Sequence, residues 1–368
     1  MSATKSSVSG TGVSTLLKLS QVVQLILQGK RDDGVVQEIG TACQAVIDNT
    51  PFQVVITKPA SLGQFLAMPN PTQAMFNQLA SEVSWSWWDL LDQIEESCFL
   101  LAPAIEKAQP FLKELWKDEV NQNSYKPPAG WKYIPVEEAV EAYRKLFGSS
   151  LKANSVLKLA REAKPRQESE GIAIWLKLST LAKLFGISGN PLEDTEKGWE
   201  AYARIVELFI PEVGKAYTKA YPNFSFRNWR EGQLTTDYLR LTPAGRKVWQ
   251  KLERESEDDF VIASYGAATG SVYSGYSVRR SRIEIVLAGD QFPQECVMVG
   301  GTIATQPDRL TKFEHLYIDC PGTKYVTGAG GRFSYSLCFY WGDGGLRFDG
   351  GWAGVAVLGF GSASGFLG

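Results

Sequence analysis

Glycine is unevenly distributed along this chain, and the imbalance restricts what its last third can form. Of the 35 glycines in 368 residues, 20 lie in residues 258–368 and 15 in residues 1–257. Glycine weakens helices but is useful where strands bend or approach another backbone closely. The last third is therefore expected to consist of β-strands, and the region before it of helices.

Side chains in the last third alternate with a period of two, which places successive residues on opposite faces of a sheet. Clear alternations begin at Arg282, Phe333 and Trp352, and Gly289-Asp290 and Asp343-Gly344-Gly345 are turn sequences between them. Eight short antiparallel strands with short connections predict a sandwich or a small closed barrel with a packed core. The eight strands are expected to start near residues 260, 269, 281, 295, 312, 332, 345 and 352.

Several turns and Gly-rich segments of this region also resemble those of a known protein family. They are Gly301–Thr305 with Asp308-Arg309-Leu310, Phe313, the strand ending Cys338–Trp341 before Gly342–Leu346, and the run from Phe348 to Gly365. These segments resemble the virulence-associated protein A family of Rhodococcus. The resemblance implies an eight-stranded antiparallel barrel without enzymatic residues, in secreted proteins that act on host membranes. This chain departs from the family in the long region before the barrel, where the family has a signal peptide and a disordered segment.

Residues 16–257 repeatedly show apolar residues at helical spacing. One helix is expected after Pro135, another ends at Gly186, and a third follows Asn190. Together with the last third, this predicts an α+β, multidomain protein, a mainly α-helical domain followed by a Gly-rich antiparallel β-barrel or sandwich. The expected parts are a disordered N-terminus (1–15), an α-helical domain (16–257, with a subdivision near 121–135) and the barrel (258–368).

Charge and cysteine content exclude several functions. Lys and Arg number 38 against 40 Asp and Glu, so the chain lacks the positive field of a nucleic-acid binder. Its five cysteines form no CxxC pair, which argues against a zinc site or a disulfide framework, and whether Cys320 and Cys338 pair is left open. His315 is the only histidine, so a Ser-His-Asp or Cys-His arrangement has only this residue to use. No cofactor and no metal is expected.

Three groups of residues are candidate contact sites. The tryptophans of the first group suit a membrane interface or a buried core. The second group, aromatic and basic, suits a partner-facing or interdomain loop. The third group is the densest basic stretch, suited to an anionic headgroup or simply to a solvated helix face. The groups are Trp85, Trp87 and Trp88; Phe224, Phe226, Arg227, Trp229 and Arg230; and Lys158, Arg161, Lys164 and Arg166.

These observations favour a non-enzymatic, effector-like or toxin-like virulence-associated protein that binds lipid membranes or a host partner, with the barrel as its binding module. The alternatives are an enzyme with a carboxylate site in the helical domain, or a structural subunit. Residues 16–27 are apolar but interrupted by Lys18, Ser20, Gln21 and Gln24, unlike a signal peptide or a membrane span. The protein is therefore expected to be secreted or injected without a classical signal peptide, or else cytoplasmic, and its oligomeric state is open.

Overall fold

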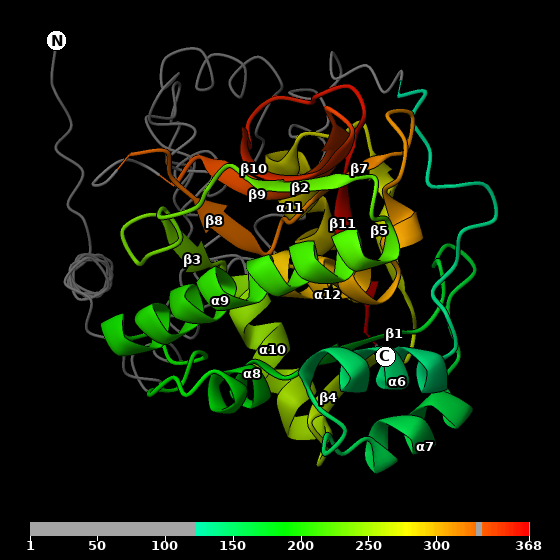
Figure 1. Cartoon of the computed structure of the whole chain (residues 1–368), viewed down its shortest axis with the longest axis vertical. Helices are drawn as coiled ribbons and strands as arrows, with labels where there is room; N and C mark the ends of the chain where they lie inside the picture. The colour runs from blue at the N-terminus through cyan, green and yellow to red at the C-terminus, as the bar shows by residue number, and fades with distance from the viewer. Residues whose placement is uncertain (1–122, 329–332, 368) are drawn as a thin grey trace, which may run out of the picture. The chain divides into compact units, whose positions relative to one another are not determined.

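The computed structural model describes residues 123–328 and 333–367, which contain both helices and strands (Figure 1). The fold is therefore α+β, as expected. The candidate residues Trp85, Trp87 and Trp88 and the expected disordered N-terminus lie outside the described residues. The helices are α6 (Val136–Phe147), α7 (Asn154–Glu162), α8 (Leu178–Leu184), α9 (Glu196–Ala220), α10 (Pro243–Glu255), α11 (Val278–Ala288), α12 (Cys296–Thr305) and the 3₁₀ turn η1 (Pro307–Arg309).

The strands form a large mixed sheet and a separate antiparallel pair. In the large sheet the order is β2, β10, β9, β7, β11, β5, with β3, β6 and β8 attached beside this path. Two of its pairings, β2 with β10 and β7 with β11, are parallel. The strands are β1 (Ala173–Leu176), β2 (Ser225–Asn228), β3 (Leu239–Leu241), β4 (Phe260–Ala263), β5 (Ala267–Ser274), β6 (Gln291–Pro293), β7 (Tyr317–Asp319), β8 (Thr323–Tyr325), β9 (Tyr335–Gly342), β10 (Gly345–Trp352) and β11 (Phe360–Phe366).

The expectation of a closed antiparallel barrel in residues 258–368 is wrong. Those of them that the structure describes do not form one. The strand order ends at β2 on one side and at β5 on the other, and these two strands do not pair. The expected boundary at residue 257 falls between α10 and β4, and strand pairing crosses it. β4 pairs with β1, and β10 pairs with β2.

Two of the eight expected strands are helices. The strand expected near residue 281 is α11, and the one expected near 295 is α12. α12 is buried from Cys296 to Ala304, and a helix that is apolar on all sides shows no one-sided pattern in its sequence. α11 buries Arg279 and Arg282 beside its isoleucines, which breaks the helical pattern and leaves a false period of two.

The strands expected near residues 345 and 332 are present as β10 and β9. The alternating run that starts at Trp352, however, is not one strand. β10 ends at Trp352, a loop follows, and β11 begins at Phe360. Alternation alone did not reveal where main-chain pairing stops. Upstream, Ala173–Leu176 is strand β1 and only Leu178–Leu184 is helical, because Ala173–Leu176 pairs along its length with β4.

Helix α9 packs against both helices and strands of the fold, among them α12 and β2. Thr195 caps its N-terminus by accepting a hydrogen bond from Gly198 N, and the helix then runs for 25 residues beside β2 (Figure 1). Its buried face packs on α12, where Gly300 allows Phe209 and Val213 to approach closely. The opposite face of α9 is left toward solvent, and this face forms the candidate site.

Candidate functional site

The aromatic and basic loop predicted from the sequence is brought to α9, and it divides into two sets of residues. Phe224 is half-buried against the core, with its ring 5.3 Å from that of Tyr221 and 6.0 Å from that of Trp341. Arg230 pairs with Asp349 at 2.6 Å and lies against Tyr325. These two residues hold the loop in place, whereas Phe226, Arg227 and Trp229 line a groove.

That groove consists of two hollows that follow the exposed face of α9. The first has a volume of about 1030 Å³ and the second about 770 Å³, and both are lined by Glu207, Leu208 and Leu234. Lining residues of α9 run from Glu196 to Thr218, which corresponds to roughly 33 Å of helix. The groove is therefore elongated.

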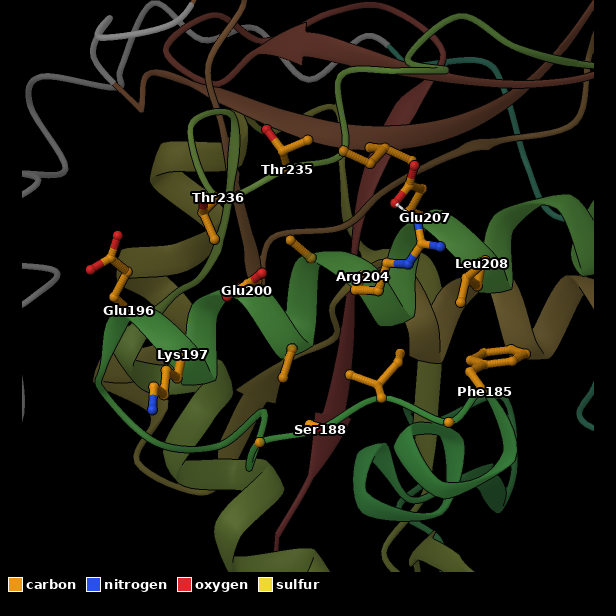
Figure 2. A pocket seen from close by; sticks show the side chains of 16 residues that line it. Phe185, Ser188, Glu196, Lys197, Glu200, Arg204, Glu207, Leu208, Thr235 and Thr236 are labelled. Atoms are coloured by element: carbon orange, nitrogen blue, oxygen red, sulfur yellow. Dashed lines mark hydrogen bonds and ion pairs between the residues drawn. The ribbon is translucent and has the colours of Figure 1, made fainter.

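The first hollow lies between α9 and two loops (Figure 2). Glu200 and Arg204 project from α9, Thr235 comes from the loop on one side, and Phe185 and Ser188 come from the segment after α8. Arg204 forms an ion pair with Glu207 one turn further along. The walls thus combine apolar surface with hydroxyl and charged groups.

The second hollow lies between α9 and the edge strand β2. The ring of Phe226 lies directly against Gly214 of α9, where a Cβ atom would collide with it. At the far end of β2, Trp229 keeps 40% of its surface exposed, and the guanidinium of Arg227 lies 3.5 Å from the centre of its ring. Glycine at position 214 therefore lets strand and helix approach closely, and Trp229 lines the same hollow.

Among the described residues, strand β2 has one edge that no other strand pairs with, and it lies along this hollow. Ser225 N donates to Gly344 O and Trp229 N donates to Phe348 O, so residues 225, 227 and 229 direct their main-chain groups at β10. Successive residues of a strand alternate in direction, so the N–H and C=O groups of Phe226 and Asn228 point away from β10. No strand of the described residues pairs with that side of β2. The groove thus has a free sheet edge as one wall.

Proline 211 adds a main-chain acceptor where the two hollows meet. It lies inside α9 and lacks the N–H that would bond the carbonyl of Glu207 one turn earlier. Glu207 lines both hollows, and Pro211 lines the second. The helix wall of the groove therefore also carries a carbonyl without its usual helical donor.

Charged groups of the groove balance one another. Both hollows together are lined by four carboxylates and four cations: Glu196, Glu200, Glu207 and Glu231, and Lys197, Arg204, Lys215 and Arg227. Neither a histidine nor a cysteine is among the described residues that line it. Within residues 123–328 and 333–367, no group of three or more His, Cys, Asp or Glu is arranged to hold a metal ion. The groove suits a neutral, polar and apolar ligand such as a polypeptide segment.

The predicted basic cluster lies elsewhere. Lys158 and Arg161 are exposed on α7, and Lys164 is exposed in the loop after it. Arg166 pairs with Asp290 at 2.7 Å and lies over the ring of Phe366. None of the four lines the groove.

A buried polar cluster beneath α9 was not predicted from the sequence. Tyr202 donates to the Glu295 carboxylate at 2.7 Å, and the same carboxylate caps α12 by accepting from Val297 N and Met298 N, each at 2.8 Å. Burial raises the pKa of Glu295, and its hydrogen bonds oppose this. Cys296 lies beside the cluster and, like Cys320 and Cys338, is a free buried thiol. An N-cap glutamate was the available signal, but a strand was expected there.

Comparisons with protein families, with curated proteins and with solved structures gave no match for this chain. Among the described residues, none of the helices is both long and apolar enough to cross a bilayer.

Proposed function

We propose that this protein is a non-enzymatic binding protein that holds an extended segment of a partner protein in the groove between α9 and β2. The observation that carries the proposal is the outer edge of β2, with which no strand of the described residues pairs and which lines a groove walled on the other side by α9. A peptide that adds to a sheet edge gains main-chain hydrogen bonds, and alternate side chains enter pockets on either side.

The dimensions and contents of the groove support a peptide over a small metabolite. A helix wall of roughly 33 Å accommodates about ten extended residues, each rising about 3.3 Å. Trp229 is a large, partly exposed aromatic side chain in the lining of the second hollow, and tryptophans often dominate binding energy at interfaces. The balanced charges favour a segment without strong net charge.

The proposal is tested by selecting binders from a displayed library of random linear peptides with the full-length protein and measuring their affinity by fluorescence anisotropy. Asn228→Pro removes one outward N–H donor of β2, and its matched control Asn228→Ala removes the same side chain while keeping that donor. We expect Asn228→Pro to weaken the selected peptides at least tenfold, on the order of one lost hydrogen bond plus a desolvated partner, and Asn228→Ala to change affinity by less than about threefold.

Trp229→Ala is the second variant, expected to weaken binding by about tenfold or more. Circular dichroism of each variant confirms that it is folded. If the library yields no micromolar binder, or if the selected peptides bind Asn228→Pro as tightly as the unchanged protein, the groove is not a strand-addition site.

A further inference from the structure

Half of the eight large hydrophobic side chains that the described residues expose lie within seven consecutive positions. They are Trp352, the last residue of β10, and Val355, Val357 and Leu358 in the loop that joins β10 to β11. Val355 is 59% exposed and Leu358 is 63% exposed. Figure 1 shows this loop in red at the top of the view, beyond the strands that it joins. Contiguous exposed apolar surface of this kind marks a contact site for a protein or a membrane.

A second apolar tip lies beside the loop. Phe313 is 55% exposed, and its ring lies 5.8 Å from that of Tyr125. Tyr125 in turn lies against Gly359 at the end of the loop, at 3.4 Å from the position of a Cβ atom. The main chain joins the two tips, because Tyr317 N donates to Gly359 O and Leu316 N donates to Lys126 O. The two tips therefore form one continuous apolar surface, called here the apolar rim: Trp352, Val355, Val357, Leu358, Phe313 and Tyr125.

We propose that the apolar rim inserts into the headgroup region of a zwitterionic phospholipid bilayer. This surface is separate from the groove and goes beyond the peptide binding proposed above. The rim is formed by two projecting loops and not by a groove, which suits a flat and deformable surface. Residues 350–367 carry no charge, so insertion buries no ionised group from the longer loop.

The exposed charges around Phe313 indicate the kind of lipid. Lys126 and Lys312 are exposed there, and so are Asp308 and Glu314. Two cations and two carboxylates give no net charge, and this matches headgroups that carry both a phosphate and an ammonium. Binding is then driven by burial of apolar side chains, and a negative surface potential adds little.

The backbone of the loop sets the depth. Its ends are fixed, because Ala353 N donates to Ser334 O, Arg279 N donates to Ala353 O, and Phe360 N donates to Val357 O. Irregular backbone keeps polar groups that hydrocarbon does not satisfy, so the loop reaches only the interface, where headgroups and water supply partners. Trp352 at the base of the loop suits that level, since its ring is apolar with one polar handle.

The test is co-sedimentation of the full-length protein with sucrose-loaded phosphatidylcholine vesicles, with and without 30% phosphatidylserine as the anionic arm (a fraction of about this size is enough to set a surface potential). We expect binding to both, with less than about a threefold gain from phosphatidylserine. The paired variant Val355→Ser with Leu358→Ser is expected to lower the partition coefficient at least tenfold.

Leu184→Ser is the matched control, since Leu184 is 41% exposed on α8 and lies outside the rim, and this variant is expected to bind like the unchanged protein. Thermal unfolding confirms that each variant is folded. Failure of the unchanged protein to bind either vesicle, equal binding by the paired variant, or binding that requires phosphatidylserine would each overturn the proposal. Because neither Val355 nor Leu358 lines the groove, peptide binding by the paired variant is measured in parallel and reports on the groove alone.

Discussion

On its buried face, helix α9 directs hydroxyl groups at fixed partners in the interior, whereas on its exposed face the polar side chains border a groove. Tyr202 donates to Glu295, and Tyr217 donates to the carbonyl of Leu310 at 2.5 Å. On the groove face, Glu200 and Lys197 are exposed, and Arg204 pairs with Glu207, a neighbour on the same helix. Polar groups of the first kind hold the helix in position, and those of the second kind remain available to a ligand.

This difference between the two faces of α9 predicts which substitutions change stability and which change binding. A buried polar group that loses its partner costs the full desolvation penalty, whereas an exposed one returns to water. Interior substitutions are therefore expected to change the free energy of unfolding, and groove substitutions to change binding while leaving stability within about 0.5 kcal/mol.

Arg309→Met should give the largest loss of stability. The fully buried guanidinium donates to Thr269 Oγ1 at 2.6 Å, to Thr269 O at 2.7 Å and to Leu316 O at 2.8 Å. The carboxylate of Glu170 accepts from Thr269 N and Oγ1 and is electrostatically coupled to Arg309. Removing the cation leaves a buried carboxylate without its counter-charge, at a cost of about 3–5 kcal/mol in urea unfolding.

The double variant Arg309→Met with Glu170→Gln separates charge from packing. If the loss comes from the stranded carboxylate, the double variant recovers part of the stability lost by Arg309→Met. A double variant as unstable as the sum of the two single variants would show that the two residues act independently, and the interior would then resemble the groove more than we infer.

Asp319→Asn should change how stability depends on pH. Burial raises the pKa of Asp319 to about 7, with Arg282 opposing the shift. Because the folded protein holds this proton at a pH where the unfolded chain has lost it, the contribution of Asp319 is fully present below about pH 4 and is lost as the pH rises through about 7. Asparagine does not ionise, so the stability of the variant relative to the unchanged protein should rise between pH 4 and pH 8.

The expected rise is about 4 kcal/mol, since the pKa is raised by about three units and each unit corresponds to about 1.4 kcal/mol. Urea unfolding of both proteins across this pH range measures it, and the difference between them cancels the other titrating groups. A difference that stays constant with pH would mean that Asp319 ionises normally in the folded protein.

The sequence predicted the exposed parts of this fold better than its interior. The helix α6 follows a visible periodicity, because it has one face toward the core and one toward solvent. The strands β9 and β10 are buried on both faces over about half their length and were found from the alternating run after Phe333 and from the turn at Asp343-Gly344-Gly345. α12 is buried on all sides, so no periodicity marked it. Where pairing stops was equally hidden, since the run from Trp352 alternates through a loop that forms no ladder.

Only part of the candidate site was predicted from the sequence. Phe226, Arg227 and Trp229 stood out as aromatic and basic residues in a short segment, and the structure places them along the groove. That this segment contains an edge strand depends on its parallel pairing with β10, more than 100 residues further along the chain. The opposite wall, from Glu200 to Leu208, reads only as the solvated side of an amphipathic helix.

Tyr202→Phe provides the smallest and most direct test of the two faces of α9. It removes one oxygen atom and leaves the Glu295 carboxylate with the main-chain donors of α12 and the Cys296 thiol. The expected loss is about 1–3 kcal/mol at pH 7. Burial already raises the pKa of Glu295 and the Tyr202 hydroxyl opposes that rise, so the variant should raise this pKa further. The loss should therefore shrink at pH 4, where the carboxyl group is protonated more fully.

Glu200→Gln, on the groove face of the same helix, is the control and should stay within about 0.5 kcal/mol at both pH values. Equal losses for the two variants would mean that the buried hydroxyl has no special role in fixing α9, and the groove wall would then need another support.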